Sequence, residues 1–402
     1  MATDFDTLLS ERTKKGVANV HGVMIKCVDK NGNEIYSKLA GHSSVAADAA
    51  PLTTDAVLRL GSATKLLTSI ALLQCIDAGL LTLDEPISRV LPELHHAPVL
   101  ERVEGSEITT RPNSTEITAR HLLTHTSGLG YWFTHPLLAK WRAARGVADD
   151  DDSQARTVAE RLAYPLMFEP GTGWLYGCGL DWAGLSVSRL HGGVSLEAYM
   201  VEHIWKPVGR EAPFPTFHLA QHPEYHSRLM QSAQRAPEGG GLKHAPDVTY
   251  CAGLDDDEGG AGLAVTMGDY VAVLQDLVSD APVLLKPETI AAMFEEQLPR
   301  DSHGVTMLQQ LRPAWDIVAG SVKGEEVNHG LGGMLTLGEA ADLGQPEGLL
   351  CWGGSPNIVW FVCRERGVAG FFGTQLSPFG DAGVRELVDG WKKDFWGGLG
   401  RQ

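Results

Sequence analysis

A serine and a lysine that stand three residues apart open a leucine-rich segment, LGSATKLLTSIALLQCIDAGLLTLDE (60–85). The apolar spacing predicts a long helix that begins at Ser62. Residues i and i+3 of a helix lie on one face, so the amine of Lys65 can approach the hydroxyl of Ser62. Leucines around a lysine disfavour its charged form, and the free N–H groups of a first helical turn favour a developing anion. These properties suit a nucleophilic serine with its base. The alternative is structural: Ser62 caps a helix and Lys65 extends into solvent.

A tyrosine followed by glycine is the second candidate. Tyr176 lies in WLYGCGLDWAGL (174–185), just before an amphipathic run and therefore near the start of a helix. A phenol held beside an ammonium group can relay a proton between a nucleophile and a leaving group. The alternative is a half-buried tyrosine of the core.

Two glycines at the edge of a strand, in CWGGSPNIVWF (351–361), form the third candidate. Glycine lets a backbone approach a ligand closely, so the N–H groups of Ser355 and Ser62 can together hold an oxyanion. A β-bulge or a tight turn is the alternative. GGSPN also approaches the G-x-S-x-G nucleophile elbow, but Asn357 replaces its last glycine and a proline lies inside it, which argues against that motif.

The elements that must position these groups follow from the hydrophobic pattern. Strands at both ends of the chain and helices in its middle predict an α/β fold, in which an antiparallel sheet from the two ends is flanked by helices. The predicted strands are 20–28, 34–40 and several short runs from 330 to 375, and a final helix carries Val384, Leu387, Val388, Trp391 and Phe395 on one face. We expect a single catalytic domain with a sheet lobe at about 1–88 and 321–402 and an inserted helical lobe at about 89–320.

Composition excludes several classes of function. The net charge of −17 argues against a nucleic-acid partner, which needs a concentrated basic face. No apolar run approaches the ~20 residues that span a bilayer, and the first residues lack a secretion signal, so we expect a cytoplasmic protein without a membrane partner. The six cysteines form no C-x-x-C pair and are expected to be reduced.

The histidines and the acidic runs do not form a recognisable metal motif. His121 and His125 have the i, i+4 spacing of zinc ligands, but no glutamate lies between them, so hydrogen bonding at a helix end is the expected role. His95 and His96 are expected in a surface loop. The runs DDDD (149–152) and DDDE (255–258) lack the spacing of a calcium loop and predict solvated acidic loops. We therefore expect neither a metal nor an organic cofactor.

The three motifs occur together in the order and approximate spacing of the serine β-lactamase-like superfamily. SATK, YGC and WGGSPNIVW, with HLLTHTSGL between the first two, resemble its class C β-lactamases and esterases. The likeness is greatest to fungal polyketide-pathway acyltransferases, the group that includes the lovastatin acyltransferase. It covers roughly residues 15–395. The resemblance implies that Ser62 is acylated, that Lys65 and Tyr176 move its protons and that Ser355 donates an oxyanion-hole N–H.

Departures from the β-lactamase pattern bear on the substrate. Cys178 replaces the asparagine that ends the second motif, and Trp352, followed by Gly353 and Gly354, stands where a cation begins the third. An indole removes the partner of a substrate carboxylate and adds apolar surface, which favours esters or thioesters of apolar acids. Tyr131 and Trp174 are nearby aromatic residues that would suit such a pocket, with a place in the core as the alternative.

The resemblance thus implies a serine acyltransferase that moves an acyl group from a thioester or ester to a hydroxyl of a small secondary metabolite. The expected donor is carried by an acyl-carrier protein or a CoA-type thiol. A carboxylesterase with the same residues is the main alternative. A β-lactamase and a non-catalytic binding protein are the remaining ones.

Overall fold

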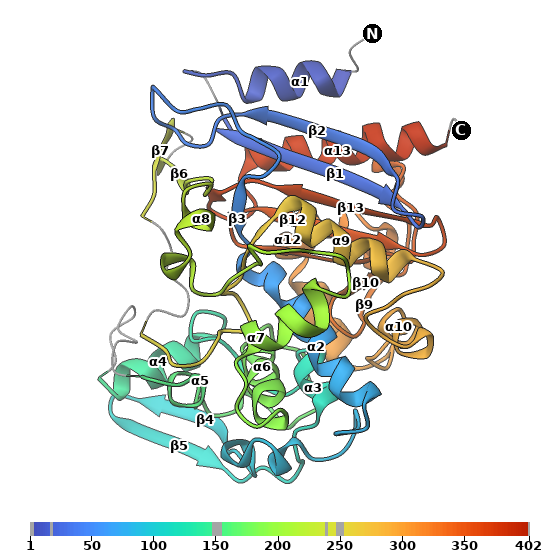
Figure 1. The fold of residues 1–402 in the computed structure, drawn as a ribbon. Coiled ribbons are helices and arrows are strands. Elements are labelled where there is room, and N and C mark those ends of the chain that lie inside the picture. Colours follow the sequence, from blue (N-terminus) through green and yellow to red (C-terminus); the bar gives the residue numbers. More distant parts are fainter. Residues whose placement is uncertain (1–3, 17–18, 147–154, 238–239, 247–252, 401–402) are drawn as a thin grey trace.

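One antiparallel sheet of seven strands dominates the upper half of the molecule in Figure 1. The computed structural model describes residues 4–16, 19–146, 155–237, 240–246 and 253–400. The strand order is β2-β1-β13-β12-β11-β10-β9. These strands are β1 (Gly22–Asp29), β2 (Glu34–Gly41), β9 (Val327–His329), β10 (Met334–Thr336), β11 (Leu350–Gly354), β12 (Ile358–Cys363) and β13 (Val368–Gly373). The prediction that both ends of the chain build one sheet is confirmed.

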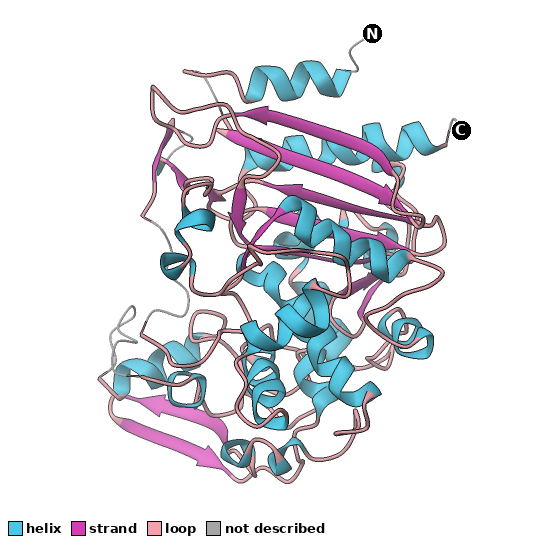
Figure 2. Cartoon of the chain, in the orientation of Figure 1, coloured by secondary structure: helices cyan, strands magenta, loops and turns pink. Residues whose placement is uncertain are grey.

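Helices cover both faces of this sheet, which explains why its central strands contain few polar residues (Figure 2). Along β12, Trp360 and Val362 belong to one core cluster, whereas Phe361 and Cys363 belong to the other, because successive side chains of a strand point to opposite faces. All six residues of β12 are buried. The sheet is therefore the middle layer of three.

The covering helices come from distant parts of the sequence. α9 (Met267–Val278) packs on β1, β12 and β13, while α12 (Arg312–Ala319), α13 (Ala382–Leu399) and α1 (Asp4–Arg12) cover the opposite face. The apolar face predicted for the final helix is buried in α13. α9 falls inside the range assigned to the helical lobe, yet it packs against the sheet. The lobe limits themselves stay a prediction.

The lower half of the molecule is mostly helical (Figure 1). Its centre is α2 (Thr64–Asp77), which is almost wholly buried and packs on α6 (Gly179–Leu190). The sequence analysis missed the hairpin of β4 (Val99–Glu104) and β5 (Glu107–Arg111). The other helices are α3 (Ala119–Leu123), α4 (Pro136–Ala144), α5 (Val158–Arg161), α7 (Leu196–Met200), α8 (Pro223–His226), α10 (Pro287–Met293) and α11 (His303–Gln310). The short strands are β3 (Val57–Arg59), β6 (Ala233–Arg235), β7 (Leu242–His244), β8 (Ala264–Thr266) and β14 (Leu376–Ser377).

The prediction of a solvated acidic loop holds only in part for residues 255–258, because Asp255 is exposed whereas Asp257 is buried. Asp255 pairs with Arg156 at 2.5 Å, Asp257 with His218 at 2.7 Å, and Glu258 with Arg161 at 2.9 Å. These partners come from other segments of the chain, which no local charge pattern reveals. The run 149–152 lies outside the described residues.

The cysteines and the lengths of the helices bear on two predictions, that the cysteines are reduced and that no segment spans a membrane. Five of the six cysteines fall in the described part of the chain, and each is buried and free. Among the helices that the structure describes, none is both long and apolar enough to cross a membrane.

Candidate active site

Ser62 lies at the junction between the sheet and the helical half. The helix predicted to begin at Ser62 begins at Thr64 instead, and Ser62 occupies a short 3-10 turn, η1 (Gly61–Ala63). Its side chain does not cap α2. Ser62 is partly exposed, whereas the residues on either side of it are buried. The hydroxyl is therefore presented at a surface by a turn that the core holds in place.

The turn at Ser62 fits closely against the end of β11. Gly61 has φ +53°, and a Cβ there would lie 2.6 Å from Ser355 Oγ and 3.0 Å from Ser355 N. A Cβ on Gly354 would lie 1.9 Å from the carbonyl oxygen of Leu60. Only glycine allows both approaches. The third motif thus lies beside the nucleophile, as the sequence analysis expected for an oxyanion-binding N–H.

Tyr176 contacts Ser62 directly. The phenolic oxygen is hydrogen-bonded to Ser62 Oγ at 2.5 Å. Tyr176 precedes α6, and the glycine after it has a packing reason, because a Cβ on Gly177 would lie 1.9 Å from the carbonyl oxygen of Leu129. A serine and a tyrosine 114 residues apart in the chain therefore share one short hydrogen bond.

Lys65 lies under the same tyrosine and is buried. Its Nζ is 4.8 Å from the centre of the Tyr176 ring and donates hydrogen bonds to Gly260 O at 2.7 Å and Tyr131 Oη at 3.1 Å. The alternative of a lysine that extends into solvent is therefore excluded for Lys65. The amine thus lies against the ring of the tyrosine whose hydroxyl contacts Ser62.

The buried carboxylate of Asp181 completes a network of hydrogen bonds around Lys65. Tyr131 donates from its hydroxyl to Asp181 Oδ2 at 2.7 Å, and the backbone N–H of Gly260 donates to Asp181 Oδ1 at 2.9 Å. Burial, and then the charge of Asp181, raises the pKa of Tyr131 well above its ordinary value. Tyr131 therefore keeps its proton and connects Lys65 to a negative charge. It occupies this polar network rather than an apolar wall.

Aromatic side chains surround the other side of Tyr176. The ring of His125 lies 5.0 Å from Tyr176, 5.7 Å from Trp174, 5.5 Å from His329 and 6.3 Å from Trp352, measured between centroids. Burial lowers the pKa of His329 to about 4 and that of His125 well below its ordinary value. Both imidazoles are therefore neutral at neutral pH and serve as uncharged walls of the site.

The remaining candidates occupy different positions. Trp352 is partly exposed and lies 5.6 Å from the Tyr176 ring, between centroids. Cys178, Gly353 and Trp174 are buried, and the Cys178 thiol is directed at the carbonyl oxygen of Gly130, 3.6 Å away. Burial raises the pKa of that thiol. Of the residues proposed for substrate binding, Trp352 and Tyr131 are thus the partly exposed ones, and both rings lie within 6 Å of the Tyr176 ring, between centroids.

The GGSPN segment is a hairpin turn between β11 and β12 and not a strand-to-helix elbow. Asn357 adopts φ +64° and is buried, and its side-chain amide donates to the carbonyl oxygens of Leu376 and Pro378. This structural role accounts for the asparagine in place of glycine. The alternative of a tight turn is therefore correct for GGSPN, and a nucleophile elbow is excluded.

His121 acts at a helix end, as expected. Its Nδ1 accepts a hydrogen bond from the backbone N–H of Thr118, and the Thr118 hydroxyl accepts one from His121 N, which together cap α3. His125, four residues later, lies beyond the helix at φ +58°. The two rings therefore do not form the i, i+4 pair of a zinc site.

Sequence reasoning missed Asp181, Gly260 and His329. Asp181 stands in the apolar helix segment GLDWAG, which was a usable signal because a buried carboxylate requires partners. Gly260 and His329 carry no local signal. A Cβ on Gly260 would lie 2.4 Å from Asp181 Oδ2 and 2.5 Å from the Tyr131 hydroxyl, so the need for glycine there is visible only in three dimensions.

Comparison with known proteins shows the family and the relatives that this chain resembles. A family model described as Beta-lactamase matches residues 7–388. The acyltransferase calJ of Penicillium decumbens is 54% identical over 415 residues, which cover 98% of this chain and 98% of that protein. A lovastatin esterase of Penicillium rubens is 36% identical, covering 87% of this chain and 88% of the esterase. The structure of a LovD6 mutant of simvastatin synthase (LovD) from Aspergillus terreus superposes with a TM-score of 0.88 at 32% identity, covering 99% of this chain and 95% of that one.

Proposed function

Because the chain belongs to the beta-lactamase family, we propose that it is a serine acyltransferase that works through an acyl-enzyme on Ser62. The observation that carries this proposal is the 2.5 Å contact of Ser62 Oγ with the Tyr176 hydroxyl above the buried amine of Lys65. The 54% identity with an acyltransferase supports transfer as the activity. A hydrolase is the second candidate, supported by the 36% identity with a lovastatin esterase.

In the first step, Ser62 Oγ attacks the carbonyl carbon of the donor. Tyr176 acts in its deprotonated form, whose negative charge the ammonium group of Lys65 stabilises. A C–O bond forms while the Ser62 hydroxyl proton passes to this phenolate oxygen and leaves Tyr176 neutral. The N–H groups of Ser62 and Ser355 hold the negative oxygen of the tetrahedral intermediate. The C–S or C–O bond to the leaving group then breaks, and Tyr176 returns the proton to the departing thiol or alcohol.

In the second step, the acceptor hydroxyl replaces the leaving group. Its oxygen attacks the acyl-enzyme, its proton passes to Tyr176, and the ester product leaves as Ser62 Oγ is protonated again. If water enters in place of the alcohol, the same sequence is hydrolysis. The groups that move protons are identical in both reactions, so transfer depends on how well the acceptor competes with water.

The substrates that we propose follow from the surroundings of Ser62 and from the names of the relatives. Trp352, which is partly exposed beside Tyr176, offers apolar surface at the place where the third motif of β-lactamases carries a cation. The named relatives are a lovastatin esterase and a simvastatin synthase. We therefore expect an apolar acyl group, carried as a CoA-type or acyl-carrier-protein thioester, and a polyketide-type alcohol as acceptor.

A competition experiment separates the two candidates. Purified protein is given a butanoyl thioester of N-acetylcysteamine, with and without a panel of apolar secondary alcohols, and thiol release and ester product are followed by chromatography. Transferase activity predicts an alcohol ester and faster thiol release when a suitable alcohol is present. Thiol release that no alcohol changes, with free butanoate as sole product, would identify a hydrolase.

Replacement of Tyr176 by phenylalanine is expected to lower kcat/KM at least ~100-fold, the usual contribution of one positioned acid–base group. The ring, and with it the packing on His125 and Trp352, is kept, so only the hydroxyl is tested. Tyr199→Phe is the matched control, since its hydroxyl bonds to Gln74 at 3.2 Å. A loss of kcat/KM below ~10-fold would show that Tyr176 serves only in packing.

Replacement of Trp352 by lysine is expected to weaken apolar acyl donors about 10-fold or more, the usual scale for loss of an apolar contact. Acetyl, butanoyl and hexanoyl thioesters are compared by kcat/KM, and the loss should increase with chain length. Trp352→Phe keeps an aromatic ring and serves as the control. An unchanged chain-length preference in Trp352→Lys would show that Trp352 does not contact the acyl group.

A further inference from the structure

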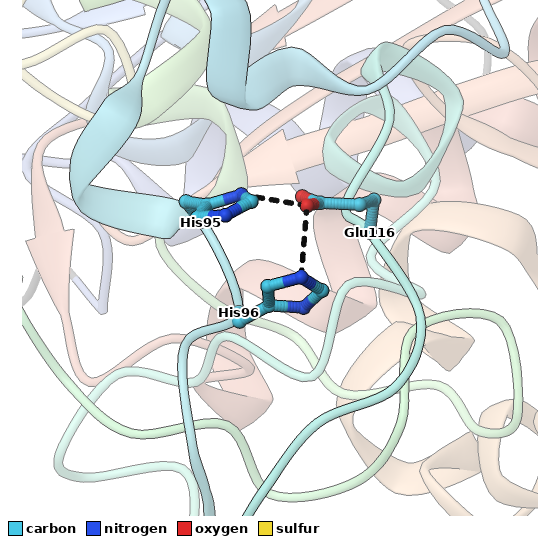
Figure 3. A group of neighbouring side chains, drawn as sticks. All are labelled: His95, His96 and Glu116. Carbon is cyan, nitrogen blue, oxygen red and sulfur yellow. Dashed lines mark ion pairs between the residues drawn. The ribbon is translucent and has the colours of Figure 1, made fainter.

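Two histidines and a glutamate from separate segments converge on the surface of the helical half (Figure 3). His95 and His96 directly follow the short 3-10 turn η3 (Pro92–Leu94), and Glu116 precedes α3. His95 Nδ1 lies 2.7 Å and His96 Nε2 3.6 Å from Glu116 Oε1. One ligand atom from each residue lies within 4.8 Å of the other two. The sequence predicts the two histidines in a surface loop and carries no local signal that connects them with Glu116, about twenty residues away.

The backbone holds the three side chains together. His96 has φ +47°, a conformation that few residues other than glycine adopt. The Glu116 segment is fixed by a hydrogen bond from Ile87 N to Ile117 O at 2.8 Å and by a β-bridge between Pro86 and Thr118. A constrained backbone that brings three donor groups to one point is the arrangement expected of a preorganised site.

One oxygen of the glutamate lacks a partner. Oε2 of Glu116 is buried and accepts no hydrogen bond from the residues that the structure describes. A buried carboxylate oxygen without a donor is costly, and because both histidines face Oε1, a cation that binds both oxygens of Glu116 would compensate it. The described ion pairs of Glu116 are both with histidines, which carry charge only when protonated. The cluster therefore has a place for a positive charge.

We propose that His95, His96 and Glu116 bind a divalent transition-metal ion, with Zn²⁺ as the best match. Two imidazole nitrogens and one carboxylate oxygen are ligands that zinc accepts, and bonds of about 2.0–2.2 Å in a tetrahedron place ligand atoms about 3.3–3.5 Å apart. The 3.6 Å separation fits this, and the 2.7 Å pair must open by less than about 1 Å. The histidine side chains are 58% and 53% exposed, which leaves the remaining coordination position to water.

The position of the site indicates a stabilising role. A metal ion would join the connection between η3 and β4 to the segment that leads into α3, and the chain beyond α3 carries His125 and Tyr131 of the active site. A ligand that binds only the folded state raises its stability. The metal is therefore expected to stabilise the fold and to take no part in acyl transfer.

Zinc binding tests this proposal directly. Chelator-treated full-length protein is titrated with Zn²⁺ by isothermal calorimetry, and the melting temperature is measured with zinc and with chelator. We expect about one bound ion, a higher melting temperature with zinc, and at least a ~10-fold weaker affinity in His96→Ala and in Glu116→Gln, because each removes a ligand. Substitution of Co²⁺ should give a visible absorption spectrum that both variants lose.

His226→Ala is the matched control, because His226 is exposed and lies outside the cluster. It is expected to bind zinc like the wild type. Equal zinc affinity and stoichiometry in the wild type, His96→Ala and Glu116→Gln would overturn the proposal, as would the absence of binding to the wild type. Thioester turnover is expected to be unchanged in both cluster variants, so failure of the metal site and failure of the acyltransferase proposal are separate results.

Discussion

Replacement of Ser62 by alanine is expected to abolish formation of an acyl-enzyme and to lower kcat/KM for any thioester donor by at least ~10⁴-fold, because no other group can form the covalent intermediate. The change removes one oxygen from a partly exposed turn, so the fold should be kept. Intact-protein mass spectrometry after a short incubation with butanoyl thioester should detect one added acyl group in the wild type and none in the variant. A fluorophosphonate probe should label the wild type alone.

Ser69→Ala is the matched control for this variant. Ser69 lies in the same helix as Lys65, and its hydroxyl bonds to the carbonyl oxygen of Lys65 at 2.8 Å, so it tests the loss of a hydroxyl without loss of the nucleophile. It is expected to be acylated and labelled like the wild type. Wild-type protein that takes up neither the acyl group nor the probe would support a non-catalytic binding protein. Labelling that survives in Ser62→Ala would identify another nucleophile.

Replacement of Lys65 by methionine is expected to lower the rate of acylation about 10³-fold, within the usual range for loss of one group that acts in proton transfer. Methionine fills the same space, whereas the positive charge beside the Tyr176 ring is lost, so the phenolate that must accept the Ser62 proton is no longer stabilised. The rate of thiol release in a single turnover measures acylation separately from later steps. Circular dichroism and the melting temperature check that the fold is kept.

The variant Asp181→Asn tests the buried negative charge near Lys65 separately from Lys65 itself. The asparagine oxygen can still accept from Tyr131, but its amide nitrogen cannot accept from the Gly260 N–H, and the negative charge that Tyr131 connects to Lys65 is lost. A loss of acylation smaller than that of Lys65→Met is expected. Near-normal acylation in Lys65→Met would contradict the role proposed for this lysine and leave Tyr176 as the sole base.

Much of the fold was predictable because its signals are local. Alternating or continuous apolar runs bounded by glycine marked the strands of the sheet, and the spacing of Val384, Leu387, Val388 and Trp391 marked the face of α13. The hairpin of β4 and β5 was missed because β5 has no buried residue and half of the residues of β4 are charged. The start of α2 was placed two residues early, since the 3-10 turn at Ser62 continues the same apolar pattern.

The residues of the candidate site also fall into two groups, those with a local signal in the sequence and those without one. Ser62, Lys65 and Tyr176 were recognisable because each stands in a short motif whose neighbours are glycine or leucine. Asp181 and Gly260 were not, because their importance comes from contact with Tyr131 and Lys65 across separations of 50 to 195 residues. Trp174 and Cys178 looked like pocket residues from their place in the chain, yet they are buried.

The order of residues thus specified the kinds of chemical group and the local elements that carry them, since turn, helix and strand preferences depend on near neighbours. It did not specify which groups meet. The contact of Ser62 with Tyr176, the burial of Lys65 above a carboxylate and the meeting of two histidines with Glu116 all depend on how distant segments pack. Packing is a property of the whole core, because each buried polar group must find its partner wherever the fold places one.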